Sequence, residues 1–444
     1  MNKDLEIRKT VLETLIQAEK SNIMSHVMIR DVLDKYDYLS QTEKAIISKI
    51  IKGVIERRIE LDYVLDIYSK TKCAKMKLPI RTILEMGVYQ ILYMDSYDTL
   101  AVNTSVDLAK KKGFSSLSGY VNAVLRNVVR NKENIPYPSK DSDNYLSVKY
   151  SVPQFLVNLI LSQYDFETAE KIFKASLESD CVKIRIKEGL SEEEKAEVIK
   201  ELKSKNAEIN QVFESCDLYS VKGAGSLSGL KTFKEGKFYV QDTGSYILCK
   251  NVPFGEKILD ACSAPGGKSI FLSERFPESL ITACDISEDK TEKINENIKR
   301  CRAKNIKTLV ADASVNNPEW NGYFDVVLAD VPCSGLGVMG KKQDIKYNLS
   351  EDGLRSLYEL QKSILLNISK YVKKGGYLVY STCTINKAEN EYLTDEFVKE
   401  SDFEYETPNF LPEELKESCR DGRISLLQGV NESDGFYISL MKRN

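Results

Sequence analysis

The sequence has little of what many catalytic and metal-binding sites use. It contains one histidine and one tryptophan among 444 residues, and no two of its ten cysteines have the C-x-x-C spacing of a zinc site. It also lacks an apolar run long enough to span a membrane, and its N-terminal segment lacks the apolar core of a secretion signal. With His26 as the one imidazole, histidine-based nucleophilic mechanisms are disfavoured. We therefore expect a cytoplasmic protein that binds no metal, with most of its thiols buried as small apolar groups.

Charge is unevenly distributed along the chain. Residues 1–133 carry 22 lysines and arginines against 17 aspartates and glutamates, a net of +5, and the remaining residues carry 41 against 49, a net of −8. The length indicates two or three domains. A basic part joined to an acidic part is typical of an enzyme with a domain that reads nucleic acid, although an ordinary solvated helical surface would give the same charge.

The residue pattern divides the chain into four parts. Residues 1–133 predict helices throughout, as in the capping box Ser40-Gln-Thr-Glu43 followed by isoleucines at helical spacing. Residues 134–148 are rich in Pro, Ser, Asp and Asn and predict a linker. Residues 149–235 mix helical stretches with strand-like ones and predict a small α+β module. The fourth part, residues 236–444, alternates strand and helix, which predicts an α/β, Rossmann-like, doubly wound sheet.

The fourth part contains a glycine-rich turn between its first predicted strand and a helix. Glycines there allow a ligand to lie against the main chain, and the helix N-terminus favours a negative group such as a carboxylate. Asp285 ends the second predicted strand, where an acidic side chain usually binds a ribose diol. Asp312 and Asp330 follow the third and fourth strands. The turn comprises Cys262, Ser263, Ala264, Pro265, Gly266, Gly267 and Lys268.

Two other kinds of nucleotide site have a glycine-rich turn at this place. A dinucleotide fold would need G-x-G-x-x-G, which is absent. Gly267-Lys268-Ser269 matches the end of a P-loop, but Cys262 stands where the first glycine is required and Pro265 removes a main-chain donor. Asp285 has no function in a P-loop. The pattern therefore favours a nucleoside cofactor.

Five segments of this part occur in a fixed order: DACSAPGGKS, ACDIS, ADAS, LADVPCSGLG and YSTCT. With them, the part resembles the Nol1/Nop2/Sun family of RNA 5-methylcytosine methyltransferases. The runs AVNTSVDLAK and GYVNAVLRN, within residues 101–127, resemble the NusB-like family of RNA-binding helical domains. Together they make the whole chain similar to bacterial members of the first family, which methylate a cytosine in small-subunit (16S) ribosomal RNA.

The resemblance implies S-adenosylmethionine as the cofactor. It places Cys262 to Lys268 along the methionine part, Asp285 at the ribose hydroxyls and Asp312 by the adenine. Asp330 would lie where cofactor and target base meet, bonding the cytosine edge, with Lys268 orienting it. The family's nucleophile corresponds to Cys383, and Cys333 then assists proton removal or product release.

The residues themselves also suit this chemistry. Carbon 5 of cytosine is a poor nucleophile until a thiolate adds to carbon 6, and a site can lower a thiol's pKa for that step. Cys333 and Cys383 follow the fourth and fifth predicted strands, whose neighbouring ends bring both thiols toward one cleft. DNA cytosine-5 enzymes use a cysteine that follows proline, as Cys333 does. The opposite assignment of the two cysteines therefore stays open.

Contacts with RNA are less clearly indicated. Lys341, Lys342 and Lys346 follow the Cys333 segment and suit RNA phosphates, although a solvated loop would carry the same charge. Arg185 lies where the family's second module has an Arg-x-Asn strand, with Lys187 in place of the asparagine. We expect a monomer whose partner is small-subunit ribosomal RNA, with no membrane or metal partner. The same reaction on transfer RNA or large-subunit RNA, and a non-catalytic assembly factor, are the alternatives.

Overall fold

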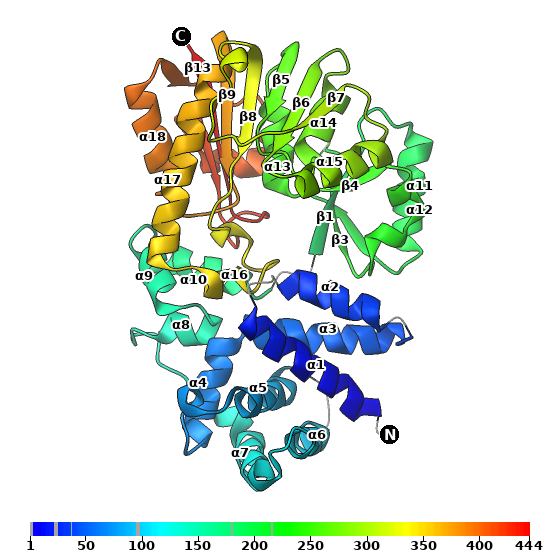
Figure 1. Ribbon diagram of the computed structural model, residues 1–444, viewed down its shortest axis with the longest axis vertical. Helices are drawn as coiled ribbons and strands as arrows, with labels where there is room; N and C mark the ends of the chain where they lie inside the picture. Colours follow the sequence, from blue (N-terminus) through cyan, green and yellow to red (C-terminus); the bar gives the residue numbers. More distant parts are fainter. Residues whose placement is uncertain (1–2, 22–24, 37, 95–97, 179–180, 215) are drawn as a thin grey trace. The chain divides into compact units, whose positions relative to one another are not determined.

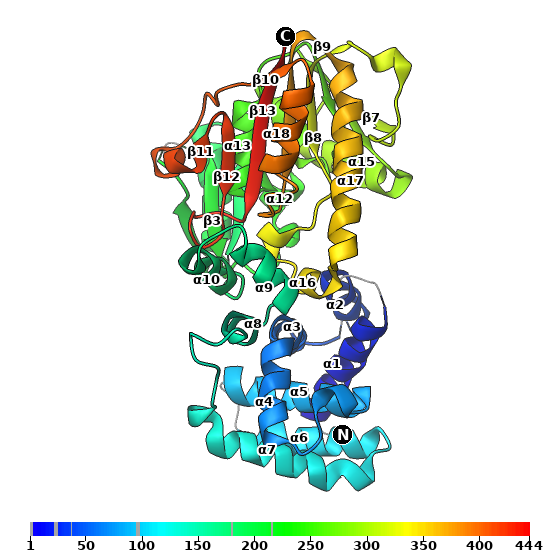
Figure 2. The same ribbon diagram turned by 90° about the vertical axis from the view of Figure 1, so that its left-hand side faces the viewer.

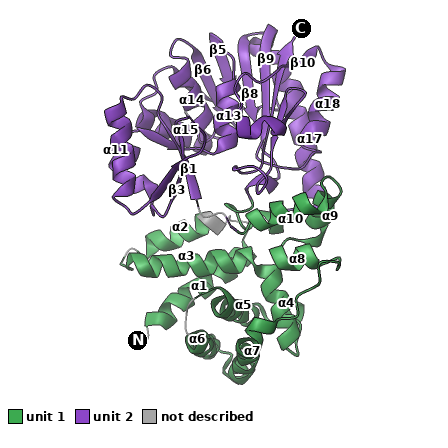
Figure 3. Ribbon diagram, turned by 180° about the vertical axis from the view of Figure 1, so that it is seen from behind, with its two compact units in different colours: residues 1–177, 339–348 green, residues 178–338, 349–444 purple. Residues whose placement is uncertain are grey.

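A computed structural model describes residues 3–21, 25–36, 38–94, 98–178, 181–214 and 216–444 (Figure 1). The side chain of His26 lies outside the described residues. The chain packs as two compact units (Figure 3). Residues 1–177 and 339–348 form one, which we call the helical unit, and residues 178–338 and 349–444 form the other, the sheet unit. The chain therefore leaves the helical unit after residue 177 and returns to it for ten residues.

The helical unit is built around an aliphatic core, as its sequence predicts. Ser40 caps α3, and Glu43 completes the predicted capping box by accepting from the Ser40 main chain at 2.8 Å. Ile47, Ile50 and Val54 of α3 are fully buried among residues from the other helices. Its helices are α1 (Lys3–Lys20), α2 (Ser25–Lys35), α3 (Gln41–Glu56), α4 (Arg58–Tyr68), α5 (Leu78–Tyr93), α6 (Asp98–Lys111), α7 (Ser118–Asn131), α8 (Tyr145–Tyr150), α9 (Gln154–Leu161), α10 (Phe166–Ala175) and α16 (Ile345–Asn348).

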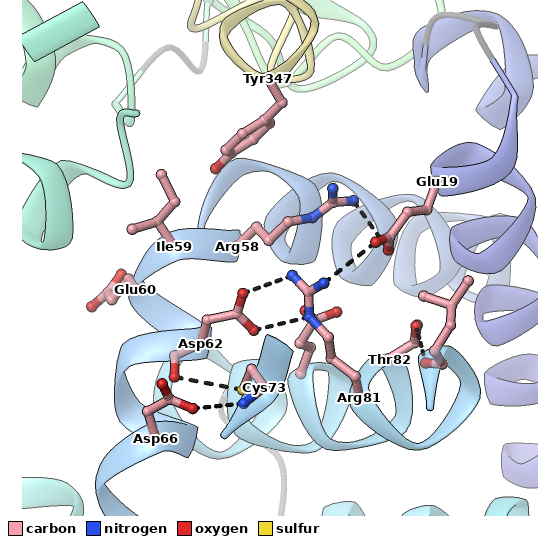
Figure 4. Close-up of polar contacts among 12 residues, drawn as sticks. Glu19, Arg58, Ile59, Glu60, Asp62, Asp66, Cys73, Arg81, Thr82 and Tyr347 are labelled. Carbon is pink, nitrogen blue, oxygen red and sulfur yellow. Dashed lines mark hydrogen bonds and ion pairs between the residues drawn. The ribbon is translucent and has the colours of Figure 1, made fainter. Parts of the chain in front are cut away.

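The returning segment, residues 339–348, packs at the corner between α3 and α4. The Tyr347 hydroxyl lies 3.1 Å from the Ser151 Oγ and 3.3 Å from the main-chain oxygen of Glu56. In Figure 4, Tyr347 points toward Arg58 and Ile59 at the start of α4. The Lys346 ammonium donates to the same Glu56 oxygen at 2.8 Å. Since Lys346 is 2% exposed, its prediction as an RNA phosphate contact is wrong. A cation at the last carbonyls of a helix stabilises that end, and Lys346 has this position on α3.

The first sheet of the sheet unit is small and antiparallel. Among the described residues its strand order is β2-β3-β1-β4. Arg185 of β1 is buried against Phe271 and pairs with Glu274 of the same unit at 2.5 Å, so it takes no part in an RNA-facing surface. The elements are β1 (Cys181–Ile186), α11 (Glu192–Lys203), β2 (Glu208–Gln211), β3 (Leu218–Lys222), α12 (Lys231–Lys234) and β4 (Phe238–Val240).

The second sheet confirms the predicted α/β fold. Its order is β11-β12-β13-β9-β8-β5-β6-β7, with β10 beside β13; β5 to β9 are parallel and β13 is antiparallel to β9. The five predicted strands are present, with ends shifted by a few residues. The strands are β5 (Lys257–Asp260), β6 (Leu280–Asp285), β7 (Ile306–Val310), β8 (Phe324–Asp330), β9 (Val372–Thr382), β10 (Phe403–Tyr405), β11 (Cys419–Arg420), β12 (Arg423–Leu426) and β13 (Phe436–Arg443).

Helices cover this sheet. The order of its strands determines where a ligand binds. In Figure 2, α17 and α18 lie next to each other beside β9 and β13. The strand order reverses at β5, which lies between β6 and β8, and ligands of such sheets bind at the carboxyl ends on either side of that point. The helices are α13 (Thr243–Asn251), α14 (Gly267–Arg275), α15 (Glu288–Cys301), α17 (Glu351–Ile368) and α18 (Glu391–Glu400). In the described part of the chain, no helix has the length and apolar character needed to cross a membrane.

Candidate cofactor and catalytic site

The predicted glycine turn connects β5 to α14. Gly266 has φ +97°, a conformation that residues with a side chain rarely adopt. A Cβ on Gly266 would lie 3.1 Å from Ile294, and one on Gly267 would lie 2.8 Å from the Tyr239 ring. Packing against Ile294 and Tyr239 therefore favours glycine at both positions.

Asp260, at the end of β5, holds the start of the turn. It is fully buried and accepts a hydrogen bond of 2.6 Å from the Ser269 hydroxyl, which in turn lies 2.8 Å from the hydroxyl of Ser263. Burial raises the pKa of Asp260 to about 6, and the Ser269 hydroxyl opposes that rise. The residues on either side of the turn are thereby tied to one carboxyl group.

The two acidic residues after β6 and β7 lie beside this turn. Asp285 accepts from the main-chain nitrogen of Ala264 at 2.9 Å and pairs with Lys290 at 2.9 Å. The main-chain nitrogen of Ala311 donates to the Asp285 carbonyl at 3.0 Å, which brings Asp312 to the same end of the sheet. Asp312 accepts from the main chain and the hydroxyl of Ser314 at 2.8 and 2.7 Å.

A largely apolar cavity of about 400 Å³ opens next to Asp312. This cavity was not predicted from the sequence. The signal was present in the small residues Ala261 and Ala311 at the strand ends and in the single tryptophan, Trp320, because small side chains beside a large one leave room. The cavity's lining also includes Leu259, Cys284, Ile368 and Tyr371.

Lys268 and Asp330 form an ion pair between the turn and the end of β8. The Lys268 Nζ lies 2.5 Å from one Asp330 oxygen, and the Ser381 hydroxyl donates to the other at 3.0 Å. Asp330 raises the pKa of Lys268 although burial acts in the opposite direction. The lysine is therefore a permanent cation, and the Asp330 carboxylate is held by partners on both sides.

The two predicted cysteines meet at the ends of β8 and β9. Their Sγ atoms are 3.2 Å apart, within hydrogen-bond reach for sulfur. The hydrogen bond with Cys383, followed by burial, raises the pKa of the Cys333 thiol well above its usual range. Either sulfur can donate the hydrogen bond that joins the two. Burial also raises the pKa of the Cys262 thiol in the glycine turn.

Glu389 is a charged residue of this region that was not predicted from the sequence. Glu389 is fully buried behind the two cysteines and bonds the residue after Cys333. Its position in the sequence just before α18 is typical of any acidic residue at a helix start, so the sequence carried no signal for it. Among the described residues, no group of three or more His, Cys, Asp or Glu side chains could hold a metal ion.

Comparisons with known proteins cover both parts of the chain. A family model described as 16S rRNA methyltransferase RsmB/F matches residues 249–442, and the NusB family matches residues 5–130. A probable ribosomal RNA small subunit methyltransferase B of Bacillus subtilis is 31% identical over 99% of each chain. A probable ribosomal RNA small subunit methyltransferase B of Synechocystis is 29% identical and covers 99% of this chain and 100% of its own. The ribosomal RNA small subunit methyltransferase B of Vibrio cholerae is 28% identical and covers 90% of each chain.

Two solved structures show the same fold. The crystal structure of PH0851 matches with a TM-score of 0.80 at 23% identity, covering 100% of this chain and 99% of its own. The crystal structure of NSun6 from Pyrococcus horikoshii with SFG matches 66% of this chain and 98% of its own, with a TM-score of 0.57 at 19% identity.

Proposed function

This chain belongs to the ribosomal RNA small subunit methyltransferase B family, and from that premise we propose that it is an S-adenosylmethionine-dependent enzyme that methylates carbon 5 of one cytosine in small-subunit (16S) ribosomal RNA. The observation that carries the chemistry is the pair of sulfur atoms 3.2 Å apart beside Asp330. Two thiols and a carboxylate at the ends of neighbouring strands suit nucleophilic addition to a pyrimidine followed by proton removal.

The residues of the glycine turn and the strand ends fit S-adenosylmethionine. Gly266 and Gly267 carry no side chains, which suits a ligand such as the methionine part that lies against the main chain. Asp285 has the position of a ribose-binding carboxylate, and the apolar cavity beside Asp312 has room for an adenine ring. When bound there, the cofactor supplies an electrophilic methyl group on a sulfonium.

In the proposed mechanism Cys383 is the nucleophile. Its thiolate would add to carbon 6 of the cytosine and make carbon 5 enamine-like. Carbon 5 could then accept a methyl group, which bound S-adenosylmethionine would supply while its sulfonium became a neutral thioether. Removal of the carbon-5 proton then lets the carbon–sulfur bond break, and the thiolate of Cys383 is restored. Cys333 stabilises that thiolate by its hydrogen bond and assists proton removal or product release. Asp330 bonds the cytosine edge while Lys268 and Ser381 hold its carboxylate in place.

The target base has to leave any helical stack to reach these sulfurs, as bases do in other enzymes that act on them. We assign RNA binding to residues 1–133, which match the NusB family over 5–130, and to the α+β module, residues 149–235. Residues 236–444 are the catalytic domain and residues 134–148 the linker. The protein is a cytoplasmic monomer in this proposal.

Bisulfite sequencing of ribosomal RNA tests the proposal. A strain that lacks the gene should lose one 5-methylcytosine from 16S RNA, and the purified protein with S-adenosylmethionine should restore it. If the 5-methylcytosine were lost from transfer RNA or large-subunit RNA instead, that RNA would be the substrate. If the protein bound RNA but methylated none, it would be an assembly factor and the proposal would be wrong.

A further inference from the structure

Two loops carry the cysteines, and both are fastened to one buried carboxylate. Glu389 Oε2 accepts from the main-chain nitrogen of Ser334 at 2.9 Å, and Oε1 accepts from the Ser334 hydroxyl at 2.5 Å. Ser334 directly follows Cys333. From the other side, the Asn386 side-chain amide donates to Oε1 at 3.0 Å. Asn386 belongs to the loop that follows Cys383, so a single side chain bridges the two loops.

Further bonds around this carboxylate fix the Cys333 peptide. The Gln361 amide of α17 donates to Glu389 Oε2 at 2.8 Å and to the main-chain oxygen of Pro332 at 2.9 Å. The residues immediately before and after Cys333 are thus held by the same group of side chains. The Ser334 hydroxyl also lies 2.7 Å from the Thr384 hydroxyl, next to Cys383.

Burial makes the charge of Glu389 significant. The residue is fully buried, and a buried carboxylate is tolerated only where hydrogen bonds replace water. Here Ser334, Gln361 and Asn386 supply four donors, as many as two carboxylate oxygens accept well. Such a fully bonded group is rigid, and it resists any movement that separates its donors.

We propose that Glu389 is a positioning residue for methyl transfer, because its carboxylate ties the Cys333 loop to the Cys383 loop and so sets the distance between the two sulfur atoms. The inference rests on the proposed function. Glu389 acts through its hydrogen bonds with Ser334 and Asn386. Its negative charge also contributes, after the Cys383 hydrogen bond and burial, to the raised pKa of Cys333.

Glu389→Gln tests this role, because the amide keeps the size of the side chain but loses the charge and turns one acceptor into a donor. The donors of Gln361 or Ser334 then face another donor, and the loops separate. The matched control is Glu391→Gln, two residues on, which accepts from the Ser425 hydroxyl and bonds neither loop. Ser334→Ala is the milder second variant. It removes the hydroxyl donor while Glu389 keeps its charge, and so remains informative if Glu389→Gln does not fold.

The first measurement reports sulfur proximity without using activity. Diamide takes two electrons and two protons from a pair of thiols, which become a disulfide, while diamide becomes the hydrazine. The Cys333–Cys383 disulfide, followed as a linked peptide by mass spectrometry, should form about 10- to 100-fold more slowly in Glu389→Gln, and less markedly so in Ser334→Ala. Glu391→Gln should oxidise at the rate of the unaltered protein.

The second measurement is steady-state methylation of RNA. In Glu389→Gln we expect kcat to fall about tenfold or more while KM for S-adenosylmethionine changes by less than about twofold, because the cofactor residues are untouched. Disulfide formation and kcat both at the unaltered rates in folded Glu389→Gln would overturn the role of Glu389. If the unaltered protein methylates no RNA, the proposed function fails instead, and the oxidation rates still decide whether Glu389 sets the sulfur distance.

Discussion

The ammonium of Lys346 donates a hydrogen bond to the main-chain oxygen of Glu56, which lies 290 residues earlier in the chain. Burial lowers the pKa of Lys346 to about 7, with Glu56 and Glu60 opposing the effect and Arg57 adding to it. A lysine predicted to meet RNA phosphates is instead an internal residue of the helical unit. Its environment has consequences for stability that depend on pH.

Substituting Lys346 should change the pH dependence of unfolding. Below about pH 7 both the native and the unfolded chain hold the proton, and the native state buries a cation. Between that pH and the ordinary lysine pKa of about 10.4, the unfolded chain binds more protons, so this group makes stability rise with pH. The gain in melting temperature of Lys346→Met over the unaltered protein should therefore be larger at pH 6 than at pH 9.5.

Lys342→Met is the control for that measurement, because Lys342 is on the same segment and only partly buried. Its melting temperature should differ from that of the unaltered protein by the same amount at both pH values. A difference for Lys346→Met that does not vary with pH would show that Lys346 titrates normally.

The cysteine assignment predicts opposite results for two substitutions. Cys383→Ala should abolish both methylation and the covalent protein–RNA adduct, because the nucleophile is gone. Cys333→Ala should leave the adduct trapped, because its resolution needs the second thiol. Gel mobility of protein–RNA mixtures under denaturing conditions measures both. Adducts that persist in Cys383→Ala would assign the nucleophile to Cys333, as in the DNA enzymes.

Removing the cation at Asp330 should slow methyl transfer. Hydrogen bonds to charged groups contribute about 1.5–3 kcal/mol, so Lys268→Met should lower kcat roughly 10- to 100-fold. Lys250→Met is the matched control, because Lys250 pairs with Glu188 at the same 2.5 Å but lies outside the catalytic residues. Equal kcat values for the two variants would mean that Lys268 does not orient Asp330.

The glycine turn gives a test that does not depend on RNA. Gly266→Ala should weaken S-adenosylmethionine binding and lower stability by roughly 1–2 kcal/mol, because alanine is strained at φ +97°. Gly119→Ala, where an added Cβ meets no atom within 4 Å, should stabilise the protein by about 0.4–1 kcal/mol. Calorimetric titration with the cofactor and thermal unfolding measure the two effects. Unchanged cofactor affinity in Gly266→Ala would contradict the assignment of the turn.

The strands and the acidic residues that follow them could be predicted because their signals are local. A buried parallel strand is a short apolar run, so the positions of Asp285 and Asp330 follow from counting along the chain. The meeting of Cys333 and Cys383 followed from the strand ends being neighbours. The structure adds their 3.2 Å separation, which no residue pattern contains.

The burial of Lys346, Arg185 and Glu389 could not be predicted for one common reason. Each is charged, and charged residues are mostly exposed unless paired. Their partners are Glu56, Glu274 and Ser334, which lie 290, 89 and 55 positions away in the sequence. Pairing across such intervals depends on the finished packing and leaves no periodic trace.

The return of residues 339–348 to the helical unit means that the two units are not consecutive segments of the chain. Between residue 177 and the C-terminus the polypeptide crosses from one unit to the other three times. A protease cut after residue 177 would yield two fragments. Lys346 and Tyr347 of the larger fragment would still bond the main-chain oxygen of Glu56 in the smaller one. The fragments should therefore co-elute until a denaturant removes residues 339–348 from the helical unit.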